Sequence, residues 1–570
     1  YADPGYSNGF ATYIRNNIFT GNCRFTSNGS NAFYEADIAG SGNKYYGNLE
    51  FNAAGAGDIY IAHVDSLWCI GNLSVNRTEA GNTIAFNAGS TINGNFSYIN
   101  NTAGNTYFGN INNKTSIGGT VNINASYTVP GTFVMYRMIN YINGGNISVD
   151  NSYGFDLRND TLLLSSLSIT GYKGNEYGRI FNNDITANVS VAADAGYSNG
   201  FATYIRNNTF TGNCIFNIYG TNTFYEADIT GSGNKYYGNL DVIANGAGDV
   251  YISHIDSLWC SGNLSIDRTT AGNTVAFNAG ATINGNFSYT NLTAGNTYLG
   301  NINNKTSIGG TVNISAIYSS PNTFLMHRII NQLNGGNIYV QNSQGFDIIN
   351  DTLIVGSLRV EGYRGNAYGS LLNNSITGNV DLADDASYSG GWFTYIRNNV
   401  ITGNCSFFNN GSNAILDADI VGSGNKYFGD LTYTRNAGSI IAAANDHNEI
   451  SGNLILKSAS NISLGKFKFI GNTNGIIEQM ISQPINIADL TMLKNTGATI
   501  SLNDPVFINN TATFTSGQIN SSAGSELIFT DNSTHTGFSD ASFVNGPVIK
   551  TGNDAFTFPV GKINKTAAIS

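Results

Sequence analysis

Short runs of alternating apolar and polar residues recur along the whole chain, each preceded by Asn or another small residue. Examples are Asn22-Cys23-Arg24-Phe25, Asn48-Leu49-Glu50-Phe51 and Asn72-Leu73-Ser74-Val75. Such alternation is typical of a strand with one buried face, and the Gly-Asn pairs beside the runs favour turns. Because the runs follow one another at intervals of about 24 residues, each predicts one coil of a repetitive structure.

A longer repeat contains these coils. Residues 5–17 return unchanged at 196–208 and, with changes, at 387–399, an offset of 191 residues each time. Eight runs fit into one offset, which predicts eight coils in each copy. We divide the chain into copy 1 (1–191), copy 2 (192–382), a partial copy 3 (383–450), divergent solenoid coils (451–540) and the truncated start of a C-terminal β module (541–570).

Stacking explains how such coils become stable. One coil cannot bury its apolar residues, but stacked coils can, with equivalent strands paired in parallel about 4.8 Å apart. Asn side chains at recurring turns are expected to form hydrogen-bond ladders. Helices are disfavoured by the 68 Gly and the missing 3.6-residue period. The sequence therefore predicts an all-β fold, a parallel β-helix (β-solenoid), right-handed by the usual handedness of parallel crossovers.

Composition supports an ordered and unusually uncharged protein. Charged residues make up 11% of the chain, and 32 Tyr with 32 Phe supply apolar surface that disordered chains lack. The net charge of −11 disfavours a nucleic-acid partner, which needs clustered Lys and Arg. No run of 18 apolar residues occurs, so we expect no membrane span.

The stretch from Phe543 to Gly561, with Pro547 and Pro559, differs from the coils before it, which include Ser501-Leu502-Asn503 and residues 515–520. Together these segments, over about residues 485–570, resemble a module of large secreted proteins from Bacteroidetes-type bacteria, the cargo of the type IX secretion system. Large repetitive adhesins and gliding-motility adhesins are typical members. The resemblance implies export to the outer cell surface, with surface glycans, other cells, or the secretion and motility machinery as partners. The chain departs from the pattern by stopping at Ser570, before any sorting domain.

One short motif agrees with that resemblance. Proteins of such bacteria carry O-linked glycans on Asp-Ser/Thr-apolar triplets, and duplication can also copy such triplets without any role. The candidate acceptors are Ser66, Thr161, Ser257 and Thr352.

Recurring aromatic pairs form a second candidate surface. Flat rings suit the faces of sugars, so an outward stripe could bind glycans, whereas stacked rings in the core are the alternative. The candidate glycan contacts are Tyr45, Tyr46, Tyr236 and Tyr237, with Trp68 and Trp259 nearby.

Recurring acidic and basic residues are candidates for a catalytic centre. Glu35, Asp37 and Lys44 return as Glu226, Asp228 and Lys235, and nearly so as Asp417, Asp419 and Lys426. A catalytic centre usually occurs once and interrupts a repeat, so we interpret these charges as solvated turns or salt links. The scarce histidines, His63, His254 and His327, do not suggest a ligand set or a general base.

No cofactor is predicted, and two other chemical groups are interpreted structurally. Gly-Asp pairs such as Gly57-Asp58 are candidate Ca²⁺ ligands at coil turns, although the calcium-binding nonapeptide is missing. Cys23, Cys214 and Cys405 occupy inward strand positions eight coils apart, too far for disulfides, so we expect core thiols.

Two functions fit the sequence. The first is the non-catalytic stalk of an extracellular adhesin that presents a tip elsewhere, because duplicated coils change length easily. The second is a polysaccharide-active β-helix enzyme or a glycan-binding solenoid. An enzyme predicts one irregular groove with non-repeating acids, for which residues 451–540 are the available region.

Overall fold

The computed structural model describes residues 9–174, 178–196, 202–365, 369–387, 393–481, 483–495, 497–562 and 565–567. The chain divides into two compact units, unit 1 (Tyr1–Phe287) and unit 2 (Ser288–Ser570), with the boundary inside copy 2. The described residues form strands and turns in a parallel solenoid of about 23 turns. The predicted all-β, parallel β-helix fold is confirmed, while its handedness stays a prediction.

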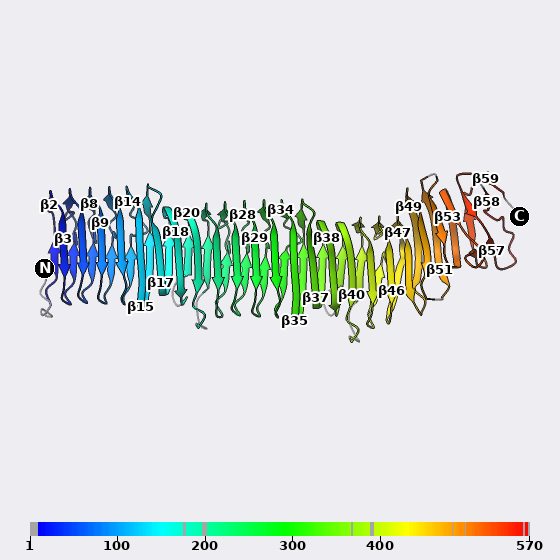
Figure 1. Cartoon of the computed structure of the whole chain (residues 1–570), viewed down its shortest axis with the longest axis horizontal. Coiled ribbons are helices and arrows are strands. Elements are labelled where there is room, and N and C mark those ends of the chain that lie inside the picture. The colour runs from blue at the N-terminus through cyan, green and yellow to red at the C-terminus, as the bar shows by residue number, and fades with distance from the viewer. Residues whose placement is uncertain are drawn as a thin grey trace. The chain divides into compact units, whose positions relative to one another are not determined.

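Figure 1 shows the strands of unit 1 stacked side by side. Their parallel pairing groups them into three walls, which we name faces A, B and C. Face A contains β1 (Thr12–Ile14), β4 (Phe33–Glu35), β7 (Ile59–Ile61), β10 (Thr83–Ala85), β13 (Thr106–Phe108), β19 (Gly178–Phe181), β21 (Thr203–Arg206), β24 (Phe224–Glu226), β27 (Val250–Ile252) and β30 (Thr274–Ala276). Face B contains β2 (Ile18–Phe19), β5 (Lys44–Tyr45), β8 (Leu67–Cys69), β11 (Ser90–Ile92), β14 (Thr115–Ile117), β16 (Met138–Asn140), β22 (Thr209–Phe210), β25 (Lys235–Tyr236), β28 (Leu258–Cys260) and β31 (Ala281–Ile283). Face C contains β3 (Cys23–Ser27), β6 (Leu49–Ala53), β9 (Leu73–Arg77), β12 (Phe96–Asn100), β23 (Cys214–Ile218), β26 (Leu240–Ala244) and β29 (Leu264–Arg268). Longer strands turn a corner and serve two faces: β15 (Val121–Tyr136), β17 (Asn146–Arg158), β18 (Thr161–Tyr172) and β20 (Asp184–Ala193).

Unit 2 is built in the same way. Its face A contains β33 (Thr297–Gly300), β39 (Gly369–Leu372), β41 (Thr394–Arg397), β44 (Ala414–Asp417), β54 (Leu527–Phe529) and β57 (Val548–Lys550). Its face B contains β34 (Thr306–Ile308), β36 (Ile329–Asn331), β42 (Val400–Ile401), β45 (Lys426–Tyr427) and β55 (Thr534–Thr536). Its face C contains β32 (Phe287–Asn291), β43 (Cys405–Asn409), β46 (Leu431–Arg435), β48 (Leu454–Ser458), β50 (Gly475–Gln479), β52 (Thr499–Leu502) and β56 (Ser542–Asn545). The corner-turning strands are β35 (Val312–His327), β37 (Gly336–Ile349), β38 (Thr352–Tyr363), β40 (Ser375–Asp384), β47 (Ser439–Ile450), β49 (Ser463–Gly471), β51 (Ile485–Lys494) and β53 (Val506–Asn520).

The repeat length follows from the pairing on face C. From Cys23 to Cys214 the stack runs through β3, β6, β9, β12, β15, β17, β18, β20 and β23, which is eight steps. In unit 2 parallel pairing continues through the divergent residues as far as β57. The last described pair, β58 (Gly561–Lys562) with β59 (Lys565–Thr566), is antiparallel and lies in the stretch assigned above to a different module.

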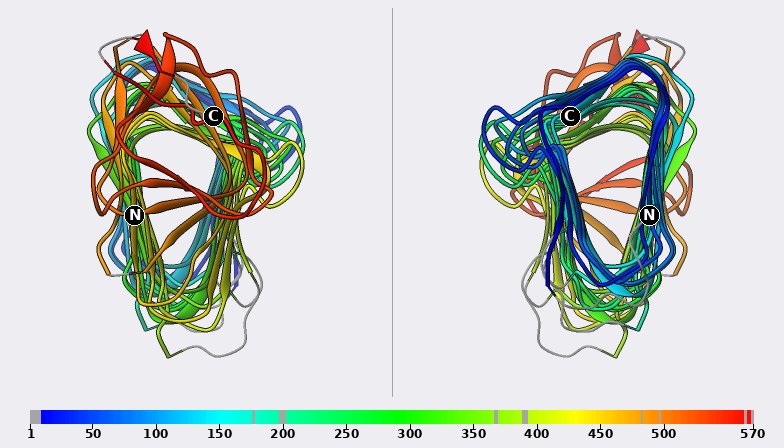
Figure 2. Two further views of the ribbon diagram at one scale, coloured as in Figure 1. Left: turned by 90° about the vertical axis from the view of Figure 1, so that its right-hand side faces the viewer. Right: turned by 90° about the vertical axis from the view of Figure 1, so that its left-hand side faces the viewer.

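Alternate side chains point into the coil and form the core. On β6 the side chains of Leu49, Phe51 and Ala53 are each 1% exposed, whereas the intervening Glu50 and Asn52 are half-exposed. Viewed along their stack, the coils of unit 1 follow similar closed paths, and in unit 2 the orange to red ribbons at the C-terminal end depart from the path of the coils before them (Figure 2). Inward side chains fill the interior of the coils. The two-residue period of the sequence thus becomes a continuous apolar interior.

The predicted Asn ladders are present. At the corner between faces B and C, Asn22 accepts the N–H of Asn48 at 2.8 Å, and Asn48 accepts the N–H of Asn72 at 2.9 Å. A second ladder is buried at the corner between faces A and B, where the side-chain oxygen of Asn208 accepts the N–H of Asn183 and its amide donates to Asn234. Each Asn side chain therefore forms hydrogen bonds with polar groups in the turn of a neighbouring coil, where the buried groups cannot bond to water.

We expect Asn208→Ala to destabilise unit 1 by about 2–3 kcal/mol, because buried donors and acceptors of two adjacent coils lose their partner. The side chain is 2% exposed and also donates to the carbonyl of Ile180 at 2.7 Å. Urea unfolding followed by circular dichroism measures the loss. Asn217→Ala, at an outward strand position, is the matched control, and an equal loss in both variants would contradict the ladder's role.

Candidate functional site

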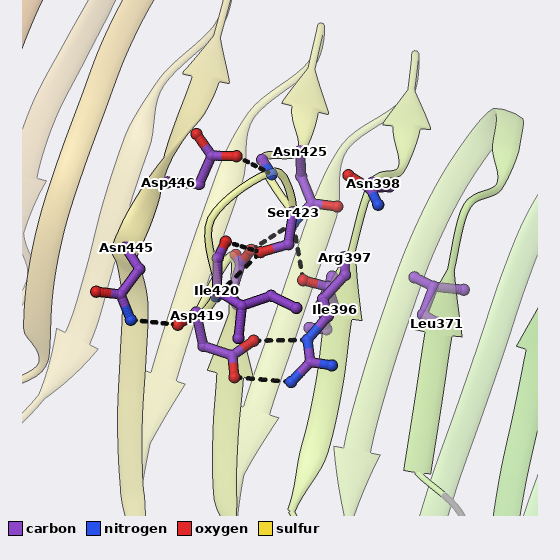
Figure 3. A network of polar contacts seen from close by, with 12 residues as sticks. Leu371, Ile396, Arg397, Asn398, Asp419, Ile420, Ser423, Asn425, Asn445 and Asp446 are labelled. Atoms are coloured by element: carbon purple, nitrogen blue, oxygen red, sulfur yellow. Dashed lines mark hydrogen bonds and ion pairs between the residues drawn. The ribbon is translucent and has the colours of Figure 1, made fainter.

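A charged corner recurs in the three copies where face A turns into face B. In copy 1 the guanidinium of Arg15 donates from Nε and Nη2 to the two carboxylate oxygens of Asp37, both at 2.6 Å. The equivalent pairs are Arg206 with Asp228 and Arg397 with Asp419, the last shown in Figure 3. Two parallel charge-assisted bonds fix the relative position of adjacent coils. The salt-link interpretation is confirmed for these aspartates.

Glu35 lies at the same corner but is buried. Its side chain and those of Glu226 and Asp417 have 0% exposure. Oε1 of Glu35 accepts an N–H of the Asn43 amide at 2.7 Å, and Oε2 accepts the backbone N–H of Ala62 at 2.8 Å. The interpretation of these three acids as solvated turns is wrong, because each carboxyl satisfies polar groups inside the corner.

Burial raises the pKa of Glu35 to about 7, that of Glu226 to about 8 and that of Asp417 to about 6. Hydrogen bonds donated to each carboxyl favour its charged form and lower its pKa, but burial has the larger effect. Raised pKa values are also common in catalytic acids. A side chain with no exposed surface does not reach a substrate in this structure, so we assign these acids to stability.

The aromatic candidates separate into core and surface residues. Tyr45 and Tyr236 have 0% exposure, so their assignment as glycan contacts is wrong. Tyr46 and Tyr237 are 46% and 52% exposed. Each packs against an outward Trp in a T-shaped pair, with centroid distances of 5.2 Å to Trp68 and 4.9 Å to Trp259. For the two exposed tyrosines, glycan contact stays a prediction.

The structure contains a second outward aromatic ladder, which the sequence pattern did not predict. On face A the ring of Tyr34 stacks on Tyr60 at 4.4 Å with an interplanar angle of 8°, and Tyr225 stacks on Tyr251 at 4.8 Å. Stacked neighbours cover the ring faces and leave ring edges outward, which is unsuited to stacking on a sugar. Aligning alternate positions of successive coils would have revealed this ladder.

The candidate glycosylation triplets have structural uses in the fold. Ser66, Ser257 and Thr352 are exposed and Thr161 is half-buried. The preceding acids are engaged: Asp65 accepts the N–H of Gly42 at 3.0 Å. Equivalent acceptors are Asp256 for Gly233, Asp160 for Met138 and Asp351 for Ile329. Modification at the four hydroxyls stays a prediction.

Cysteines and histidines occupy structural surroundings. All five cysteines are free. The interpretation as core thiols is confirmed for Cys214 and Cys405, which are buried, whereas Cys23 is half-buried. The ring of His63 packs edge-on against Tyr60 at 4.8 Å, and His254 does the same with Tyr251 at 4.7 Å. Burial lowers the pKa of His327, which favours its neutral form.

The candidate calcium turn has a hydrogen-bonding use. One carboxylate oxygen of Asp58 accepts the N–H of Asn82 from the next coil at 2.8 Å. Within the described ranges, no group of three or more His, Cys, Asp and Glu side chains is arranged to hold a metal. The calcium proposal therefore stays a prediction.

Copy 3 departs from the other copies on face B. Lys44 pairs in register with Trp68, and Lys235 with Trp259, but Lys426 pairs with Glu449. A recess of about 490 Å³ opens there. It is lined by Asn398, Gly422, Gly424, Asn425, Lys426, Asp446, His447, Glu449, Lys468 and Thr491. Asp446 corresponds to Asp65 and Asp256, which accept the equivalent backbone N–H groups. Glu449 is a non-repeating acid, and it lies just before residues 451–540, the region in which such acids were expected.

The corner loop beside this recess is held by short bonds (Figure 3). The hydroxyl of Ser423 donates to the carbonyl of Ile420 at 2.6 Å, and the N–H of Gly424 donates to Asp446 at 2.9 Å. The amide of Asn425 donates to buried Asp417 at 2.7 Å. The recess therefore has a fixed wall.

Comparison with known proteins finds no matching family model, no matching curated protein and no matching solved structure. In the part of the chain that the structure describes, no helix is long and apolar enough to cross a membrane. Function must therefore be argued from the geometry itself.

Proposed function

We propose that the chain is a non-catalytic shaft segment of an extracellular adhesin, a spacer whose length is set by the number of stacked coils. The observation that carries this proposal is the recurrence of the same cross-coil supports at 191-residue intervals. Arg15–Asp37, Arg206–Asp228 and Arg397–Asp419 have nearly the same geometry. Each coil of a solenoid is stabilised mainly by its neighbours. Ion pairs that recur between adjacent coils therefore suit a protein that keeps a fixed length and acts as a spacer.

The location and partners belong to the same proposal. The resemblance near Phe543–Gly561 supports export to the outer cell surface, where a tip elsewhere in the protein contacts glycans or other cells, and where secretion or motility machinery engages the protein. Antibody labelling of intact producing cells tests this location. Labelling that appears only after lysis would contradict it.

Deleting residues 192–382 should shorten the folded chain by about 38 Å, because eight coils at about 4.8 Å are removed and the strand register is restored. Small-angle X-ray scattering measures the maximum dimension of each purified protein. A deletion of 192–370 joins β20 of face C directly to β39 of face A without the residues that connect these faces, and should lose ordered structure at the junction instead. An unchanged dimension in the folded 192–382 deletion would refute the spacer role.

A further inference from the structure

The recess of copy 3 arises from single-residue replacements on face B. In copies 1 and 2 the outward Trp68 and Trp259 cover the wall and pack against Tyr46 and Tyr237. In copy 3 Glu449 occupies the corresponding strand position, beside Lys426 and Lys468 in register. A carboxylate is much smaller than an indole, so the wall opens and becomes charged.

Hydrogen-bond donors exceed free acceptors in this recess. Nζ of Lys426 lies 3.3 Å and Nζ of Lys468 lies 2.8 Å from the carboxylate oxygens of Glu449. Each ammonium has three N–H donors, so each retains capacity after its bond to Glu449. The acceptors of Asp446 are engaged by the N–H groups of Gly424 and His447.

The ionised side chains of the recess are compatible with an anionic ligand. Burial opposes ionisation of Glu449, but Lys468 and Lys426 outweigh it and hold the pKa of this carboxyl below its ordinary value. The two lysines balance the carboxylates of Glu449 and Asp446 at neutral pH, so the recess carries no net negative charge in a chain whose net charge is −11. The half-exposed ring of His447 lies 3.9 Å from the carboxylate of Asp446 on the recess wall.

We propose that this recess binds a sugar residue that carries a carboxylate, as in an acidic polysaccharide. The carboxylate accepts N–H bonds from Lys426 and Lys468, while Asn398 and Thr491 on the recess wall contact ring hydroxyls. The volume of about 490 Å³ accommodates one such residue. Because the recess opens on the flat outer wall, neighbouring sugars of a chain continue outside it.

Isothermal titration calorimetry of the full chain with trigalacturonate tests the proposal, with maltotriose as the neutral sugar and acetate as the free carboxylate. We expect one site for trigalacturonate per chain, and affinity for it at least tenfold above that for either comparator. The double variant Lys426→Met/Lys468→Met should weaken binding at least tenfold. Lys235→Met, the matched lysine beside Trp259, should leave the affinity within twofold of the parent.

Two further variants keep the test decisive if the lysine variant folds poorly. Glu449→Trp restores the residue that copies 1 and 2 carry and should abolish binding. Trp259→Glu with Thr282→Lys copies the charged register into copy 2, where Lys235, Trp259 and Thr282 are consecutive partners, and should raise the stoichiometry to two. No binding of trigalacturonate up to about 10 mM, equal binding of maltotriose or acetate, or an unaffected Glu449→Trp variant would each overturn the proposal.

Discussion

Arg77→Met should destabilise unit 1 by about 3 kcal/mol and accelerate amide exchange in β7 and β10. Arg77 ends β9 with 1% exposure, and its guanidinium donates to the carbonyls of Gly57 at 3.2 Å, Glu79 at 3.3 Å and Asn82 at 2.7 Å. Methionine fills much of the volume but donates nothing, so buried carbonyls of two successive turns lose their partner. Burial lowers the pKa of Arg77, which means that the fold destabilises its charged form. Removing the buried charge therefore offsets part of the stability lost with the hydrogen bonds.

Urea unfolding and hydrogen exchange measured by mass spectrometry test this prediction. Arg24→Met is the matched control, because Arg24 is a largely exposed arginine on face C that pairs with Glu50. This substitution should lower the free energy of unfolding by less than about 1 kcal/mol. Arg268 has the same environment eight coils away, so Arg268→Met should produce a similar loss. Equal effects of the Arg24 and Arg77 variants would show that the buried network contributes little.

The stability of unit 1 should fall as pH rises from about 4.5 to about 8. Burial raises the pKa of Glu226 to about 8 from 4.5. Between these values the folded state binds more protons than the unfolded state, so the free energy of unfolding decreases with increasing pH. The full contribution of this carboxyl is present below about pH 4.5. Its loss amounts to about 5 kcal/mol above pH 8.

Urea midpoints at pH 5, 7 and 9 measure this dependence. Glu226→Gln should make it shallower because glutamine does not titrate, while Glu35 and Asp160, whose pKa values burial also raises, retain part of it. The free energy of unfolding of the variant should also be about 1–3 kcal/mol lower at pH 5. The side-chain NH₂ of Gln cannot accept a hydrogen bond, so one of the two N–H donors, from Asn234 or from Ser253, loses its acceptor. Glu50→Gln, at a half-exposed carboxyl, is the control. A wild-type profile that stays flat from pH 5 to 9 would contradict the role of the buried acid.

The sequence predicts the strands well because its period of two survives in every coil. Leu49, Phe51 and Ala53 alternate with polar residues, and the same alternation is what a half-buried strand requires. Asn ladders were predictable for a related reason: equivalent turn residues must stack when coils stack, so Asn22, Asn48 and Asn72 come into line.

The pattern could not assign corner residues to core or surface. Glu35 and Asp37 have the same spacing in each copy, yet Glu35 is buried and Asp37 pairs with Arg15 near the surface. Tyr45 and Tyr46 are adjacent and equally aromatic, and only the direction of the strand makes one core and the other exposed. At corners the backbone leaves the two-residue period, and non-Gly residues such as Ala36 adopt positive φ. Sequence alternation therefore carries no information there.

The sequence by itself determined the all-β class, the coil length and the eight-coil repeat, because these depend on periodicity alone. The tertiary structure decided which charged side chains are buried, and at which coil a substitution on face B opens a recess. Glu449 reads as one more surface acid until parallel pairing places it between Lys426 and Lys468, 23 residues before it and 19 after it. Those separations bring charges together only when successive coils lie one strand spacing apart.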